Sequence, residues 1–256
     1  MSAVYGIVAR DLARAFRQKS RVIGGLARPF MWFLLVGNGY NAIVRVEGVS
    51  SYQAFIYPGL IVMATLFGSM LTAISTVYDR EFGMLRLMLA SPAGVTAILG
   101  GRMIAATAIG MVQGGVLLLC VPLVMSVGAG QVAAAVGALA LGAAASSVMG
   151  LLVAAPLRSV ENFAAIVNVV LFPLLFLSGA LYPTAHMPVP LRIAARLNPV
   201  SYAVDLMRGA LSQPSEIGAT RSVMMLASTT IVAFVLTALV FDPEQRLIGR
   251  KQGRQR

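Results

Sequence analysis

Residues 103–157 read MIAATAIGMVQGGVLLLCVPLVMSVGAGQVAAAVGALALGAAASSVMGLLVAAPL, a run of 55 residues without one charged side chain. As a single helix this run would be about 80 Å long, whereas the hydrocarbon core of a bilayer is about 30 Å thick. The run must therefore fold back on itself within a membrane. Its strongest helix breakers cluster at residues 126–131, where we expect the turn between two spans.

The composition of the whole chain also indicates a membrane protein. Of its 256 residues, 58% are hydrophobic and 11% are charged, and the mean hydropathy is +0.84. Such values are typical of integral membrane proteins. Since no length is left for a separate soluble catalytic domain, we predict one all-α, polytopic membrane domain over residues 1–256.

The distribution of hydrophobic residues predicts six transmembrane helices, at Val22–Val44, Ala54–Tyr78, Gly101–Val127, Gln131–Ala155, Asn162–Tyr182 and Ser222–Phe241. An even number of spans places both termini on one side of the membrane. Fifteen of the 20 basic residues fall on that side, and the positive-inside rule makes it cytoplasmic. The predicted domain then consists of an interfacial helix (1–21), a six-span region (22–241) and a basic cytoplasmic tail (242–256).

The formal net charge of +11 comes from 18 Arg and two Lys against nine acidic residues. Because the basic residues gather near the chain ends, membrane topology and anionic lipid headgroups explain them better than nucleic acid does. We therefore expect membrane lipids, and no nucleic acid, as partners.

The first 21 residues have the pattern of an amphipathic helix. One face carries Val4, Ile7, Val8, Leu12 and Phe16, and the opposite face carries Arg10, Arg14, Arg17 and Arg21. This arrangement predicts an interfacial helix with arginines toward lipid phosphates. Two interpretations stay open: a simple membrane anchor, or a cytoplasmic-surface helix that also contacts a partner subunit.

Residues that support enzyme chemistry are missing from the sequence. Cys120 is the only cysteine and lies in an apolar run, and the only histidine, His186, lies in a Pro-rich segment, so a metal centre is not expected. No nucleotide-binding P-loop motif occurs, and no carboxylate lies at the midplane, where ion-coupled carriers usually bind. The chain is therefore predicted not to be an enzyme and to bind no cofactor, and energy for any uphill transport must come from another subunit. An autonomous channel or secondary carrier is the alternative.

The segment DREFGMLRLMLASPAG, residues 79–94, is where another subunit would transmit that energy. Phe82, Leu85, Met88 and Leu89 form an apolar stripe at helical spacing. The stripe predicts a short amphipathic helix at the cytoplasmic surface, which either fills a groove on a soluble partner or rests on lipid.

Two groups of residues resemble the permease subunits of the ABC type-2 exporter family. The first is Asp79-Arg80-Glu81-Phe82-Gly83 followed by Leu89-Ala90-Ser91-Pro92, which is similar to the family's coupling helix. The second resembles the exit of the fifth span and the outer segment that follows: Phe176-Leu177-Ser178-Gly179-Ala180-Leu181-Tyr182-Pro183, then Met187-Pro188, Asn198-Pro199, Tyr202, Asp205 and Arg208. Met84 departs from the residue types typical of its position.

The resemblance implies a permease subunit of a bacterial drug- or lipo-oligosaccharide-type ABC exporter, in the plasma (inner) membrane. It implies a homodimer or paired permease, each copy docked on one of two ABC ATPase subunits that bind ATP and Mg²⁺. It also implies that the second and fifth spans line the path. The residues it assigns to coupling are Glu81, Phe82, Gly83, Leu85, Met88, Leu89, Ser91 and Pro92.

The second and fifth spans each carry a polar or aromatic stripe on one face. Thr65, Ser69, Thr72 and Thr76 either bond their own helix and allow close packing or line a substrate path. In the fifth span the stripe consists of Asn168, Phe172 and Phe176, beside a possible hinge at Pro173.

The polar segment of residues 182–221 is too long for a simple connection between spans. Proline and capping residues predict two short re-entrant helices that form a lid, with an ordinary capped loop as the alternative. Asp205 and Arg208 are expected to pair at i, i+3. The predicted outer gate consists of Tyr182, Asn198, Tyr202, Asp205 and Arg208.

Overall fold

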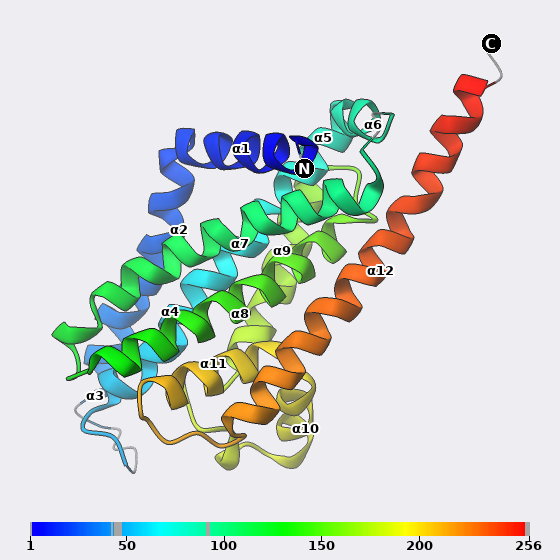
Figure 1. Cartoon of the computed structure of the whole chain (residues 1–256). Coiled ribbons are helices and arrows are strands. Elements are labelled where there is room, and N and C mark those ends of the chain that lie inside the picture. The colour runs from blue at the N-terminus through cyan, green and yellow to red at the C-terminus, as the bar shows by residue number, and fades with distance from the viewer. Residues whose placement is uncertain (1, 42, 44–47, 91–92, 254–256) are drawn as a thin grey trace.

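The computed structural model describes residues 2–41, 43, 48–90 and 93–253, the side chains at 2–3, 19–22 and 242–253 excepted. Within these residues the secondary structure is entirely helical (Figure 1). The elements are α1 (Ser2–Arg17), α2 (Lys19–Trp32), the π-helical turn η1 (Phe33–Gly37), α3 (Asn38–Asn41), α4 (Tyr52–Thr72), α5 (Ile74–Glu81), α6 (Met84–Leu89), α7 (Val95–Leu119), the 3₁₀ turn η2 (Val121–Leu123), α8 (Ala129–Ala154), α9 (Val160–Phe176), the 3₁₀ turn η3 (Thr184–His186), α10 (Val189–Leu197), α11 (Pro199–Ala210) and α12 (Ala219–Gly253).

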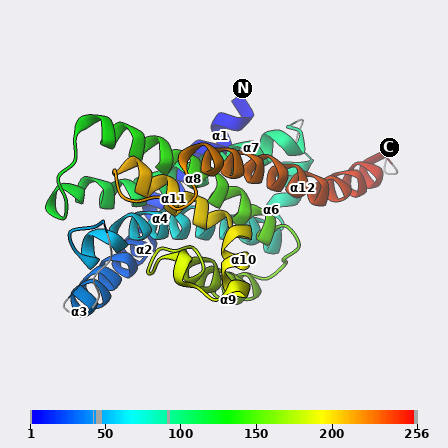
Figure 2. The same ribbon diagram turned by 90° about the horizontal axis from the view of Figure 1, so that it is seen from below.

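α4 is the central helix of the bundle. It packs against α2, α7, α8 and α11, and nearly all of its residues are buried. A helix that is apolar on every side needs neighbours on every side. By contrast, α12 runs along the edge of the bundle, and Figure 2 shows it on the side of α8 opposite to α9.

The turn predicted at residues 126–131 is confirmed. α7 and η2 end at Leu123, α8 begins at Ala129, and the two long helices pack side by side. The backbone N–H of Gly128 donates to Gln131 Oε1 at 2.6 Å, so the Gln131 side chain caps the start of α8.

Four helical stretches among the described residues are long and apolar enough to cross a bilayer: Tyr52–Glu81, Val95–Leu123, Ala129–Ala154 and Ala219–Phe241. They overlap the predicted second, third, fourth and sixth spans. α9, at Val160–Phe176, is apolar but shorter, and it ends six residues before the predicted fifth span does. α7 begins at Val95, six residues before the predicted third span, so Arg102 lies inside the helix rather than at its edge.

The predicted first span, Val22–Val44, overlaps α2, η1 and α3, while residues 42 and 44 lie outside the described residues. Pro29 lies inside α2, and the π-helical turn follows it. Since proline has no N–H to donate, it interrupts the regular hydrogen-bond ladder of the helix.

The two ends of the bundle carry the predicted sites. α1, α5 and α6 lie together at one end, and α10 and α11 lie at the other (Figure 1). We call these the α6 end and the α10 end.

Candidate functional site

The predicted coupling helix of residues 81–91 is divided in the structure. α5 ends at Glu81, α6 begins at Met84, and Gly83 between them has φ +77°. Only glycine adopts this left-handed conformation without strain, which explains why the turn has a glycine. Ser91 and Pro92 lie outside the described residues, so their predicted role in coupling stays a prediction.

The apolar stripe of α6 faces the protein itself, which corrects the expectation of an outward ridge. Leu85 and Leu89 are 1% and 3% exposed and pack against Ile98, Leu99 and Phe241. They hold α6 onto α7 and α12 and cannot fill a groove on another protein. The large hydrophobic side chains that remain exposed here are Phe82, Met84 and Leu87.

Asp79, at the end of α5, joins three helices through a buried charge cluster. Its Oδ2 accepts from Arg102 of α7 at 2.5 Å and from Arg10 of α1 at 2.8 Å, and its Oδ1 accepts from Arg14 of α1 at 3.1 Å. Arg102 also donates to Thr76 Oγ1 at 2.9 Å. We call Arg10, Arg14, Asp79 and Arg102 the Asp79 cluster.

For Arg10 and Arg14, the cluster corrects the prediction that α1 turns its arginines toward lipid phosphates; Arg17 is exposed, and the side chain of Arg21 lies outside the described residues. Arg10 and Arg14 bind Asp79, and Arg10 also pairs with Asp11, which is 3% exposed. Burial disfavours the charge on Arg10, but the carboxylates of Asp11 and Asp79 outweigh this effect and raise its pKa. α1 therefore packs onto α7 and α5 by charge pairing.

Arg80 binds the end of α8. Its Nη1 donates to the carbonyl oxygens of Ala155, of Leu157 at 2.8 Å and of Ala154 at 3.3 Å. These carbonyls have no partner within a helix, and a basic side chain is favoured there by the helix dipole. The guanidinium also lies 4.9 Å from the ring centroid of Phe241 in α12.

Glu81 binds the start of α9. The backbone N–H of Val160 donates to Glu81 Oε2 at 3.1 Å, at a helix N-terminus where a carboxylate is stabilising. Three consecutive residues therefore bind different parts of the bundle. Asp79 binds α1 and α7, Arg80 binds the end of α8, and Glu81 binds the start of α9.

Sequence reasoning missed Arg102 and Asp11 as members of this site. The available signals were a lone base next to the long uncharged run and a lone acid in a segment rich in arginine. Arg102 binds Asp79, which is far from it in the chain, whereas Asp11 binds the adjacent Arg10.

The hydroxyl stripe of the second span is buried between helices. Thr65 and Thr72 donate to the carbonyls of Ile61 and Gly68 in their own helix, at 2.8 and 2.6 Å. A Cβ atom at Gly110 or Gly114 of α7 would overlap the hydroxyl oxygen of Ser69 or Thr65. This geometry fits the close-packing alternative, and no part of the stripe is exposed at a path within this chain.

The stripe of the fifth span is exposed on α9. Asn168, Phe172 and Phe176 all lie on the outward side, and the Phe176 ring packs edge-on against Trp32 at 5.9 Å between centroids. Their predicted role at a path stays a prediction.

Two short helices, α10 and α11, form the α10 end, as predicted for residues 182–221, but Asp205 and Arg208 do not pair. Asp205 accepts from the N–H groups of Glu216, Ile217 and Gly218 at 2.7 to 3.0 Å and from Ser222 Oγ at 3.1 Å. It thereby fixes the connection into α12, because three backbone donors and the Ser222 hydroxyl occupy its two carboxylate oxygens.

Arg208 instead donates to the carbonyl of Gly179 at 2.6 Å and lies 4.1 Å from the ring centroid of Phe55. Burial lowers its pKa to about 10. It ties α11 to α4 and to the turn after α9.

The remaining predicted gate residues stabilise local structure. Asn198 donates to the carbonyl of Leu174 and accepts from Val200 N at the start of α11, and Tyr202 donates to the carbonyl of Arg196. The Tyr182 side chain is 40% exposed. Whether these residues open and close a path stays a prediction.

Comparison with known proteins identifies the family. Residues 2–212 match the family described as ABC-2 type transporter. Nodulation protein J of Rhizobium leguminosarum bv. trifolii is 27% identical over 235 residues, 86% of this chain and 85% of that protein. The protein of Pyropia yezoensis named as a transport permease, ycf38, is 25% identical over 218 residues, 79% of this chain and 71% of that one. The probable multidrug ABC transporter permease YbhR of Escherichia coli (strain K12) is 29% identical over 207 residues, 78% of this chain and 52% of that one.

Proposed function

Because the chain belongs to the ABC-2 type transporter family, we propose that it is the permease subunit of an ATP-driven exporter powered by a separate ATPase. The observation that carries this proposal is the attachment of α6 to the bundle. Asp79, Arg80 and Glu81 connect the base of α6 with α1, α7, α8 and α9. ATP and Mg²⁺ would bind on the partner subunit.

The surface for that partner is the exposed side of the α5–α6 junction. Phe82, Met84 and Leu87 are 72%, 46% and 68% exposed, while Leu85 and Leu89 anchor the opposite side. Three large hydrophobic side chains beside the exposed Arg86 suit a groove on a soluble protein. Closure of the ATPase would press on this surface and move the attached helices together.

The topology that supports this function has six spans with both termini in the cytoplasm. The first span would use α2, η1 and α3, and the fifth would use α9 with the turn that follows it. The excess of basic residues at the α6 end favours its cytoplasmic placement in a bacterial plasma membrane. Two copies would assemble around the path, with the exposed face of α9 toward it.

The cargo is an amphiphile of the drug, lipid or lipo-oligosaccharide class. The multidrug name of one relative supports this class. So does the exposed stripe of α9, where Phe172 and Phe176 lie on the same face as the amide of Asn168.

The experiment is to produce the tagged chain in its own host, purify it from membranes and measure MgATP hydrolysis in the preparation. Leu87→Asp places a charge on the exposed surface of α6, and Leu123→Asp is the matched control in η2 at the other end of α7, where the side chain is 86% exposed. We expect the wild type and Leu123→Asp to retain the ATPase and Leu87→Asp to lose it. Equal hydrolysis in all three preparations would contradict the proposed coupling surface. Uphill solute uptake by the chain alone in vesicles would contradict the proposed function.

A further inference from the structure

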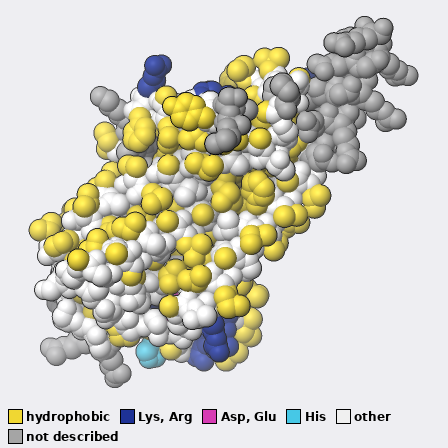
Figure 3. Space-filling model, in the orientation of Figure 1, with side chains coloured by type: hydrophobic (Ala, Val, Ile, Leu, Met, Phe, Trp, Pro, Cys, Tyr) yellow, Lys and Arg dark blue, Asp and Glu magenta, His cyan; other side chains and the backbone are white. Residues whose placement is uncertain are grey.

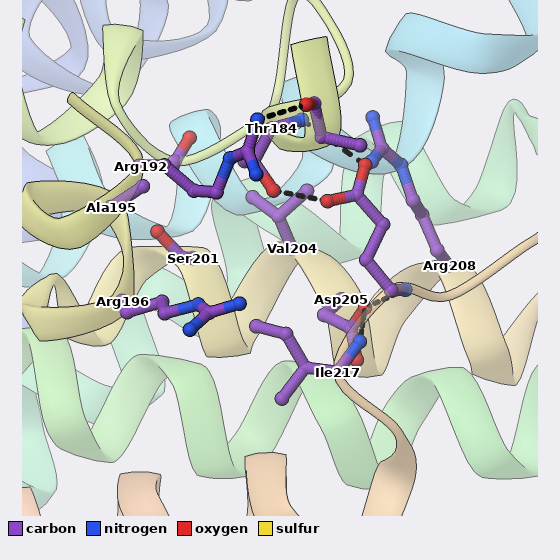
Figure 4. Close-up of a pocket in the computed structure, with 12 residues that line it drawn as sticks. Thr184, Arg192, Ala195, Arg196, Ser201, Val204, Asp205, Arg208 and Ile217 are labelled. Atoms are coloured by element: carbon purple, nitrogen blue, oxygen red, sulfur yellow. Dashed lines mark hydrogen bonds between the residues drawn. The ribbon is translucent and has the colours of Figure 1, made fainter. Parts of the chain in front are cut away.

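A pocket of about 380 Å³ lies at the α10 end, between α10, α11 and the segments before α10 and before α12 (Figure 4). Its size is in the range of sites that bind small molecules or head groups, about 300 to 1,000 Å³. No role in ATPase coupling involves it, because it lies at the opposite end of the bundle from α6 (Figure 1).

Three arginines line this pocket: Arg192, Arg196 and Arg208. The two carboxylates beside them are already occupied by other donors. Asp205 accepts from three backbone N–H groups and Ser222, and Glu216 accepts from the N–H and hydroxyl of Thr184. The pocket therefore offers more positive charge and more donors than its own acceptors use.

Several of those donors have no partner among the described residues. The Nε atoms of Arg192 and Arg208 are buried without a hydrogen bond, and Arg208 as a whole is 4% exposed. The guanidinium of Arg196 extends across the pocket in Figure 4, and it forms no hydrogen bond or ion pair within the described part of the chain. Buried guanidinium donors are costly to leave unpaired, so the site is suited to an incoming acceptor.

An apolar ridge lies beside the arginines on α10. Val189, Ile193 and Leu197 recur at i, i+4 and i+8 and are 65%, 56% and 73% exposed. Arg192 and Arg196 lie on the adjacent face, toward the pocket. Figure 3 shows basic side chains next to hydrophobic ones at this end of the molecule.

We propose that this pocket binds the phosphate group of an anionic amphiphile, whose hydrocarbon chain lies along the ridge of α10. Guanidinium groups match phosphate oxygens with paired hydrogen bonds. Three arginines supply more donors than the two oxygens of a carboxylate accept, whereas a phosphodiester presents two ester oxygens in addition to its two anionic oxygens. The ridge accounts for a chain attached to the phosphate.

The site is a property of this chain alone, so binding is measured on the purified protein in uncharged detergent without any ATPase. Three probes are compared: dihexanoyl phosphatidylglycerol, inorganic phosphate and dihexanoylglycerol. The rise of the unfolding midpoint with probe concentration gives each dissociation constant. Failure of the ATPase experiment above would leave this measurement unaffected.

Arg196→Gln is the test variant, because Arg196 is exposed and holds no part of the fold together. Arg221→Gln, in the first turn of α12 and outside the pocket, is the matched control. We expect Arg196→Gln to weaken phosphatidylglycerol binding about tenfold, as loss of a charge-assisted hydrogen bond does, and Arg221→Gln to leave it unchanged.

The probes also distinguish the source of the phosphate. Tighter binding of phosphatidylglycerol than of inorganic phosphate, weakened further by Leu197→Ser, supports a lipid-like amphiphile. If phosphatidylglycerol and inorganic phosphate bind equally tightly, and Arg196→Gln weakens the binding of each, the ridge is not a binding element and the pocket binds a soluble phosphate. The proposal is overturned if phosphatidylglycerol binds equally tightly to the wild type, Arg196→Gln and Arg192→Gln. It is also overturned if phosphatidylglycerol binds no more tightly than dihexanoylglycerol.

Discussion

Arg102 Nη2 donates to Asp79 Oδ2 at 2.5 Å, and the two side chains are only 2% and 3% exposed. This pair joins the end of the α4–α5 stretch to the second turn of α7, and α1 adds two further arginines to the same carboxylate. A buried charge pair contributes little net stability when it forms, because both ions lose water. Once it is built, removing one partner leaves the other charge buried and unpaired.

Replacement of Asp79 by Asn should therefore destabilise the bundle strongly. Removing one partner of a buried pair costs about 3–5 kcal/mol. Thermal unfolding followed by circular dichroism in detergent measures the loss, with Glu161→Gln, an exposed acid in the first turn of α9, as control. If both variants unfold at the wild-type temperature, the cluster does not hold α1 and α7 together.

The two leucines of α6 should respond in opposite ways to truncation. Leu85 is buried against α7 and α12, so Leu85→Ala should cost about 2–5 kcal/mol of unfolding free energy. Leu87 is 68% exposed, and Leu87→Ala should change stability by less than about 0.5 kcal/mol while weakening ATPase association. Unfolding curves and co-purified ATPase activity of the same preparations check both. Equal destabilisation by the two variants would refute the inward orientation of Leu85.

The sequence predicted which residues of α6 share a face but not which face is inward. Leu85 and Leu89 are buried, but Leu87 gives α6 a second apolar side, and Phe82, expected in the same stripe as Leu85, is exposed at the α5–α6 junction. Amphipathicity cannot rank two hydrophobic faces, because the choice depends on what α7 and α12 present to them. Gly83 was recognisable from the motif, whereas its left-handed conformation, which splits the helix, became apparent only in the structure.

Arg102 shows a second limit of prediction from the sequence. Charges are normally excluded from the interior of a span, so the sequence placed Arg102 at the edge of the third span, whose predicted start is Gly101. The helix begins seven residues before it, because Asp79 and Thr76 from another helix satisfy the guanidinium. In contrast, the turn between α7 and α8 was predictable, since it depends on local breakers and on the cap from Gln131.

Glycines of α7 provide a matched pair for testing how closely α4 and α7 pack. At Gly110 a Cβ would overlap Ser69 Oγ, whereas at Gly115 nothing lies within 4 Å. Gly110→Ala should separate the helices and lower the unfolding temperature. Gly115→Ala should stabilise by about 0.5–1 kcal/mol, because alanine loses less backbone entropy in a helix. The same unfolding assay compares them, and a Gly110→Ala variant as stable as Gly115→Ala would contradict the close packing.

Asp205 and Arg208 show why the pairing expected at the α10 end did not form. The i, i+3 spacing places them within reach on an exposed helix, but both residues are buried in the fold. Asp205 instead accepts from consecutive N–H groups of the connection into α12, and Arg208 is drawn to Gly179 and Phe55. Buried backbone N–H groups need hydrogen-bond acceptors, and here they take the carboxylate of Asp205. Helical spacing alone, which predicts the pair with Arg208, does not include this competition.

Replacement of Asp205 by Ala should loosen this connection without unfolding the bundle. The amides of Glu216, Ile217 and Gly218 would lose their acceptor, so their hydrogen exchange should become faster. Amides of α4 and α8 should keep their protection, because their hydrogen bonds lie within the bundle. Hydrogen–deuterium exchange with peptide mass analysis measures both groups, and Arg221→Ala, in the first turn of α12, is the nearby control. Unchanged exchange at residues 216–218 in Asp205→Ala would mean that the loop holds its shape without the carboxylate.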